Sequence, residues 1–469
     1  MKWFTDFFFV KLKMKWTDFL MLFGAGFAIP VLFERANLLR VHNPTETVLP
    51  IWLLSLFFAC TLVLFGIYLY FERKSDFIKV HPALLIGAII LLVLVSVTTF
   101  IQPDEIHNII YIQNPNIGNV GDSLDVVTTI SYKIRIVVFY NLILFAIALY
   151  LAIVVLPRRF KEMNLKVLEV ACLVLYFVLF CSVIYSLIAE YSSYVYLFKF
   201  IRGQVDVHEL EIHAPMGMFT HRNVNGMFMV LAIFSSLFGY ELSKNKYHFI
   251  ATGFFSINLI FTICKTGIII TIVSLVMYLI YKMIVLYKHD KKKGIIGLSI
   301  TSGALLLVII IGVILFLAVP SINEKVTNLF RGGETLKSRV NIWQTAFAML
   351  KPAWWITGKG YWIFDITMRE CNWAAQNDTT GSPHNWFIGF ISRGGILMVG
   401  AYLFLMGYTI KKLIELSKFD KDFTFVLGLG LLAFLIYSNF EDYYYVTVII
   451  SIITMFVLNH LKYQSAKSE

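Results

Sequence analysis

The feature that most constrains this chain is its series of long apolar segments. The 469 residues are 58% hydrophobic and only 15% charged, and the mean hydropathy is +0.75. Soluble domains carry about 25% charged residues, and an apolar run of about 20 residues is long enough to cross a lipid bilayer. The sequence therefore predicts an integral membrane protein and argues against a set of soluble domains.

Twelve such segments predict an all-α, polytopic membrane bundle, because lipid offers no hydrogen-bond partners to non-helical backbone. They cover residues 17–33, 48–71, 83–101, 135–156, 167–188, 223–241, 247–264, 266–287, 294–319, 386–409, 423–439 and 444–460. The seventh and eighth are divided only by Lys265-Thr266-Gly267. We expect one membrane domain over residues 1–469, with a large extracytoplasmic loop, residues 320–385, between the ninth and tenth helices.

The basic residues predict the orientation. With the N-terminus inside and the spans alternating, most lysines and arginines fall on the cytoplasmic side, as the positive-inside rule requires. Both termini are then cytoplasmic, and residues 1–16 form a helix on the membrane surface. The net charge of +11 does not indicate nucleic acid in so apolar a chain; it favours contact with anionic membrane lipid.

Several kinds of site have no motif in the sequence. The five cysteines form no Cys-x-x-Cys pair, which argues against a disulfide framework or a metal knuckle. A phosphate-binding Gly-rich loop, a His-Glu-x-x-His motif and an outer Asp-x-Asp pair are also absent. We therefore expect no ATP, no metal and no other cofactor.

The large outer loop ends in Pro383-His384-Asn385, just before the tenth span. His384 can be a surface histidine near the lipid headgroups, or a general base, since imidazole accepts a proton near neutral pH. Asn385 can orient a substrate hydroxyl. Arg393 follows nine residues later, roughly 12 Å deeper along a helix. Its charge should face the bundle interior, although snorkelling to the interface is the alternative.

Other candidate residues lie at predicted outer helix ends. Lys265 and Arg339 can bind phosphate oxygens, or can be a helix-end lysine and an ordinary loop arginine. Arg222 and Asn225 can line a site before the sixth span, but helix capping by asparagine explains them equally well. Asp442 belongs to an acidic pair after the eleventh span.

The order of these residues resembles the O-antigen polymerase and O-antigen ligase superfamily. The resemblance covers about residues 215–442. It rests on Gly217-x-Phe219 through Asn225, on Lys265 at a helix break, on Arg339-x-x-x-Trp343, on Gly358-x-Gly360 and on His384-Asn385 followed by a glycine pair.

This resemblance implies a GT-C-like fold and a metal-independent, inverting glycosyltransferase in the bacterial cytoplasmic membrane. The donor would be an oligosaccharide on undecaprenyl pyrophosphate. His384 would activate the acceptor hydroxyl, and Lys265 and Arg339 would hold the pyrophosphate. Many relatives have arginine where this chain has Lys265, which keeps the charge but loses the bidentate fork. Asp442 would match a carboxylate that recurs in ligases.

The motifs do not separate a polymerase from a ligase. Lysine, isoleucine and asparagine usage typical of a low-GC Gram-positive organism, which has no lipid A, favours a polymerase. A polymerase would work with a flippase and a chain-length regulator. A lipid-linked glycan flippase is the alternative from another class, but it should carry charges through many spans, whereas these cluster on one side.

Overall fold

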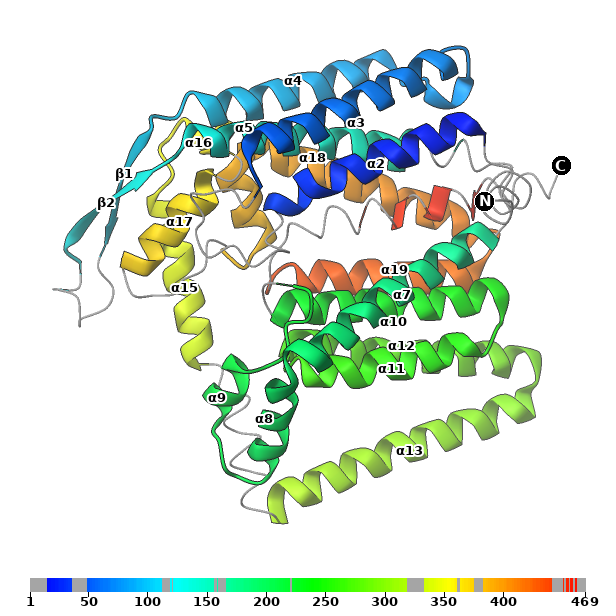
Figure 1. The fold of residues 1–469 in the computed structure, drawn as a ribbon. Coiled ribbons are helices and arrows are strands. Elements are labelled where there is room, and N and C mark those ends of the chain that lie inside the picture. The colour runs from blue at the N-terminus through cyan, green and yellow to red at the C-terminus, as the bar shows by residue number, and fades with distance from the viewer. Residues whose placement is uncertain are drawn as a thin grey trace.

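The computed structural model describes residues 15–35, 49–111, 119, 121–155, 158, 166–219, 222–318, 333–360, 363–374, 383–440, 450, 453–454, 456–458 and 460–461. Its long helices form a bundle, and the two strands and the short α-helices gather at one end of it (Figure 1). Every predicted span before the last overlaps one of these helices. Most of the last predicted span, 444–460, and of the predicted surface helix, 1–16, lies outside the described residues.

The elements have the following bounds. The long helices are α2 (Trp16–Arg35), α3 (Ile51–Glu72), α4 (Pro82–Phe100), α5 (Tyr132–Tyr150, continued by the π-helical turn Leu151–Val155), α7 (Lys166–Ala189), α10 (Arg222–Ser243), α11 (Tyr247–Phe261), α12 (Lys265–His289), α13 (Lys291–Ala318), α18 (Trp386–Ser417) and α19 (Lys421–Tyr437). The short elements are the 3-10 turn Asp76–Ile78, strands β1 (Glu105–Tyr111) and β2 (Ser123–Thr129), and helices α8 (Tyr191–Ile201), α9 (Val207–Ile212), α15 (Gly333–Ala348), α16 (Trp354–Thr357) and α17 (Ile363–Ala374).

The helices have the lengths and surfaces of a membrane bundle. Within the described chain, 7 helices are long and apolar enough to cross a bilayer. Only 17% of the apolar window in α4 is buried, against 67% in α10 and 61% in α18. Exposed apolar helix faces on this scale require lipid as their solvent. The prediction of an all-α membrane protein is thus confirmed for the bundle, with α10 and α18 as its central helices.

The division between the seventh and eighth predicted spans is also present, but its position differs. Helix α11 ends at Phe261, and Ile263 adopts a left-handed φ of 53°. Lys265 does not interrupt the helix; it begins α12. The turn packs tightly, because a Cβ atom on Gly226 would lie 2.5 Å from the Cys264 Cβ atom. A glycine in α10 therefore lets the break approach the centre of the bundle.

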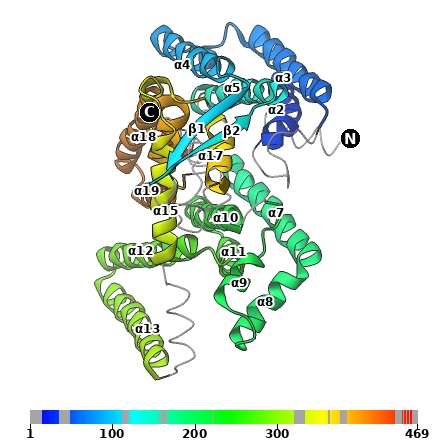
Figure 2. The ribbon, with the colours of Figure 1, turned by 90° about the vertical axis from the view of Figure 1, so that its left-hand side faces the viewer.

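The all-α prediction missed a β-hairpin. Strands β1 and β2 pair antiparallel, and alternate residues of each are buried. Figure 2 views this end of the bundle and shows the hairpin lying over α17, with α15 below. A shared hydrophobic cluster joins the hairpin to these helices; it includes Ile110, Val126, Ile342, Phe364 and Met368. The predicted loop 320–385 thus contributes three helices within its described part.

Helix α18 is interrupted at Gly395, whose φ and ψ are 63° and −164°. The interruption removes the helical partners of nearby carbonyls, which need other donors when buried. The Lys359 N–H donates to the Ser392 carbonyl (2.7 Å), and the Gly360 N–H donates to the Arg393 carbonyl (3.2 Å). The chain just after α16 therefore completes the hydrogen bonding of the interrupted helix.

Candidate functional site

The end of α19 contacts the first turns of three other helices. The Tyr437 hydroxyl donates to the Asn223 carbonyl (2.7 Å) and lies 3.0 Å from the Cys264 Sγ atom. One hydroxyl has a single proton, so the thiol is the donor in the second contact. The next residue, Ser438, accepts a hydrogen bond from the Trp386 N–H (3.0 Å). Residues 437–440 are therefore a hub for the first turns of α10, α12 and α18.

His384 lies two residues before Trp386 in a strained backbone conformation. Its φ is 49°, a left-handed value that is uncommon outside glycine and that costs roughly 1–3 kcal/mol. The conformation is held from both sides. The Trp343 indole N–H donates to the Pro383 carbonyl (2.7 Å), and the Asn385 side chain caps α18 by accepting from the Phe387 and Ile388 N–H groups (3.0 and 3.2 Å). The backbone on both sides of the half-buried His384 is thus held in place.

Helix α15 brings Arg339 to the same region. Arg339 lies one turn before Trp343, so both side chains lie on one face of the helix. The guanidinium lies over the Phe440 ring, 5.8 Å from its centroid. Phe440 belongs to the hub at the end of α19, so Arg339 and His384 approach this hub from the same loop.

Two further predicted cations meet on one carboxylate. The Glu211 Oε2 atom lies 2.9 Å from an Arg222 guanidinium nitrogen, and its Oε1 atom lies 2.8 Å from the Lys265 Nζ atom. Burial raises the pKa of the Glu211 carboxyl, but the charges of Arg222 and Lys265 outweigh burial and hold the pKa below its ordinary value. Because Asn223 and Cys264 contact Tyr437, this cluster also borders the hub.

The segment before α10 is anchored from α7 and α8. The Glu190 carboxylate accepts from the Met216 and Gly217 N–H groups (3.0 and 2.9 Å). Gly217 has a φ of 63°, and a Cβ atom there would lie 2.6 Å from the Ser182 Oγ atom. Asn225 is inside α10 and donates to the Pro215 carbonyl (3.2 Å). The alternative that Asn225 caps the helix is therefore wrong, since it ties the helix to the preceding loop.

Arg393 faces the interior, as expected, and its side chain is fully buried. Its guanidinium forms a bidentate pair with the Asp365 carboxylate of α17, through Nε–Oδ2 (2.7 Å) and a second short contact to Oδ1. A buried arginine normally needs such a partner. The pair accounts for the charge and connects α17 to α18. Asp442 lies outside the described residues.

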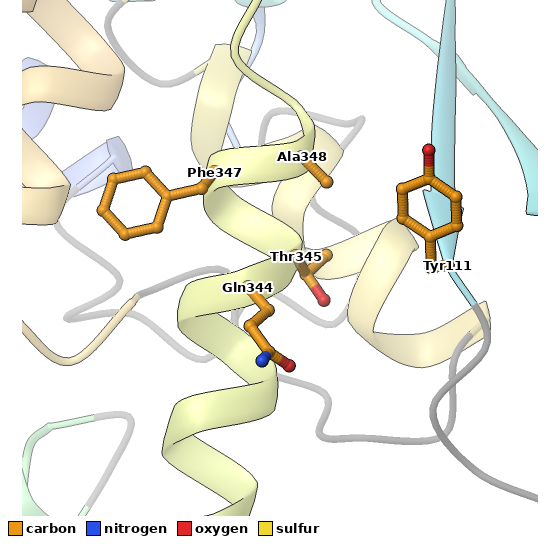
Figure 3. Close-up of a pocket in the computed structure, with 5 residues that line it drawn as sticks. All are labelled: Tyr111, Gln344, Thr345, Phe347 and Ala348. Atoms are coloured by element: carbon orange, nitrogen blue, oxygen red, sulfur yellow. The ribbon is translucent and has the colours of Figure 1, made fainter. Parts of the chain in front are cut away.

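A cavity of about 420 Å³ lies between the hairpin and α15. Its lining is Tyr111 of β1 and Gln344, Thr345, Phe347 and Ala348 of α15, as Figure 3 shows. The residues of α15 that line this cavity begin at Gln344, directly after Trp343. One helix therefore carries both Arg339 and a cavity with aromatic, amide and hydroxyl groups.

The sequence indicates the candidate cations but not the groups that hold them in position. Glu211 is an acidic residue in a connecting segment, and no spacing linked it to Arg222 or Lys265. Tyr437 lies inside the predicted span 423–439, and nothing in the sequence distinguishes it from other aromatic residues of the spans. Asp365 lay in the predicted loop, 28 residues before its partner Arg393. The role of each of these three residues depends on a contact with a residue distant in the sequence. One sequence alone does not reveal such contacts.

Comparison with known proteins finds a family match in the part of the chain that carries most of the candidate residues. A family model described as O-antigen ligase matches residues 250–413, about a third of the chain. The match contains Lys265, Arg339, His384 and Arg393, whereas Arg222 lies before it. No curated protein and no solved structure matches the chain. Residues 250–413 therefore carry the likeness to the O-antigen ligase and polymerase superfamily.

Proposed function

We propose that this protein polymerises oligosaccharide repeat units carried on undecaprenyl pyrophosphate, as an inverting and metal-independent glycosyltransferase. The single observation that carries the proposal is the arrangement around residues 437–440. Three cations, Arg222, Lys265 and Arg339, and the strained His384 all lie within a residue or two of contacts to this hub. Cations bind the oxygens of a pyrophosphate, and a half-buried imidazole can accept the proton of an acceptor hydroxyl.

The chemistry follows from these groups. The acceptor hydroxyl oxygen attacks the anomeric carbon of the donor sugar from the face opposite the pyrophosphate. The bond between the anomeric carbon and the pyrophosphate oxygen breaks, and undecaprenyl pyrophosphate leaves with the bonding electrons. His384 takes the hydroxyl proton. Negative charge grows on the leaving group, so fixed cations stabilise the transition state more than the ground state.

The cavity beside α15 supports a path for the glycan. Aromatic faces pack against the apolar faces of sugar rings, and amide and hydroxyl groups bind sugar hydroxyls. Gln344 and Thr345 supply the amide and the hydroxyl from α15, the helix that carries Arg339, and Tyr111 of β1 supplies an aromatic ring opposite them. We place the glycan there, with its reducing end toward the pyrophosphate site. Activity on a second class of acceptor would make the protein a ligase.

The test uses the purified protein in proteoliposomes with the lipid-linked oligosaccharide of the producing cells, in buffer containing EDTA. A polymerase gives a ladder of products spaced by one repeat unit. A ligase gives a single transfer, and only when a second acceptor is added. A flippase moves the lipid across the bilayer and forms no glycosidic bond. A requirement for added magnesium or manganese would contradict the metal-independent mechanism.

A further inference from the structure

Glu211 occupies the position that an anionic ligand would take between two cations. Each of its carboxylate oxygens faces a different cation, Lys265 at 2.8 Å and Arg222 at 2.9 Å. The three side chains come from three elements, α9, α12 and α10. Phosphate oxygens bind guanidinium and ammonium groups with this same geometry.

The surroundings favour more negative charge than one carboxylate provides. Arg222 and Lys265 are the first residues of α10 and α12, where the helix dipoles also attract anions. Two cations face a single carboxylate in the ion pairs of this cluster. Moreover, one buried terminal nitrogen of Arg222, the Nη1 atom, has no hydrogen-bond partner among the described residues. A donor left unsatisfied at this point suits a ligand with more acceptor oxygens than a carboxylate has.

Glu211 lies on a short helix whose position other contacts hold. It lies on the six-residue helix α9, and its side chain is 24% exposed. The helix is held by neighbouring apolar residues, chiefly Leu210, Ala214 and Ile263. The loop that follows is fixed by Glu190. The anchoring of α9 and of the loop after it therefore does not depend on the two ion pairs of Glu211.

We infer that Glu211 is an internal competitor of the pyrophosphate: it neutralises Arg222 and Lys265 when the site is empty, and the donor displaces it. The inference rests on the proposed function. A pyrophosphate diester carries more negative charge than a carboxylate, so the bound donor displaces Glu211 from the two cations. Because Glu211 competes for the same cations, it also lowers the affinity for the undecaprenyl pyrophosphate product. Glu211 thus sets the donor affinity at a level that permits turnover.

The experiment measures binding of inorganic pyrophosphate to the full-length protein in detergent by isothermal titration calorimetry. Glu211→Gln keeps the side-chain shape but removes the competing charge, so affinity should rise on the order of tenfold, the effect of about 1.4 kcal/mol. Glu209→Gln, at an exposed position of the same helix, is the matched control and should bind like wild type. Adding Arg222→Gln to Glu211→Gln should abolish the gain.

The outcomes separate the inference from the proposed function. If wild type binds pyrophosphate and Glu211→Gln binds equally or more weakly, Glu211 only positions the cations and the inference is wrong. If neither protein binds pyrophosphate, the proposed anion site itself is wrong, and the inference falls with it. Glu211→Asp provides a second variant. Its shorter side chain bridges the cations poorly, so it should also bind pyrophosphate more tightly than wild type, and a failure to do so counts against the inference.

Discussion

At the residue scale, the candidate site contains three cations that neighbouring groups hold in position. Arg339 is positioned by α15, whereas Arg222 and Lys265 are the first residues of α10 and α12. Fixed charges need no reorganisation when charge develops on a leaving group, and removing one such group typically costs about 10²–10³ in rate.

Substitution of these cations tests the phosphate-binding role. Arg339→Ala and Lys265→Ala should each lower the transfer rate by about 10²-fold at unchanged protein level. Lys265→Arg should remain active, because it keeps the charge and adds a bidentate fork. Lys246→Ala, at an exposed position beyond the far end of α10, is the control. A wild-type transfer rate in both alanine variants would show that Arg339 and Lys265 do not bind the pyrophosphate.

The sequence identified the cations and His384 because charge in an apolar chain is conspicuous. It did not reveal that Asn385 caps α18 or that Arg393 pairs with Asp365. Both interactions use residues whose polar chemistry also suits a substrate. Residue type therefore predicted where polar groups gather. The three-dimensional contacts show which of these groups already bond to other parts of the protein.

At the scale of elements, the interruption of α18 controls how the loop helices sit on the bundle. A Cβ atom on Gly395 would lie 2.0 Å from the Ile356 carbonyl oxygen, and the residue has a positive φ. Gly395→Ala should therefore lower the midpoint of thermal unfolding in detergent by several degrees, because the strain and the clash both act in the folded state. Gly400→Ala, in the same helix with no atom within 4 Å of the added Cβ, should not. Equal midpoints for the two variants would contradict the packing.

The same junction buries Lys359. Its ammonium contacts the Asn108 side chain of β1, and burial lowers the pKa of the Lys359 amine from 10.5 to about 7. Between pH 7 and pH 10.5 the unfolded chain binds more protons at this residue than the folded chain, so the free energy of unfolding should rise with pH across that window. Lys359→Met should flatten this rise, measured as the thermal midpoint at pH 7 and pH 9. Lys351→Met, at an exposed site nearby, should leave the slope unchanged.

Helices were predicted from the sequence wherever a long apolar run marked a membrane span. Long apolar runs located the helices, since any spanning segment must satisfy its own backbone. The hairpin was missed because Glu105–Tyr111 alternates over only a few residues, and its buried side faces other loop elements. Helices α15 and α17 were missed for the same reason, as their apolar faces pack against the hairpin.

At the scale of the molecule, the hairpin, α8–α9 and α15–α17 all lie at one end of the bundle (Figure 1). The basic residues of the sequence predict that this end faces outward. An alkaline phosphatase reporter fused after Glu334 should therefore be active, and one fused after Lys292 should be inactive, with a cytoplasmic reporter giving the opposite pattern. Reversed results would place the candidate site on the cytoplasmic face, where the proposed donor is not delivered.

The most direct test of the account separates donor binding from transfer at His384. General-base catalysis contributes roughly 10²–10⁴-fold, and a base must be neutral to accept a proton. His384→Asn keeps hydrogen bonding and tolerates the left-handed backbone, but lacks basicity. In proteoliposomes with lipid-linked donor, it should bind the donor like wild type and lose transfer by about 10²-fold or more. A folded His384→Asn protein that forms product at the wild-type rate would contradict the account.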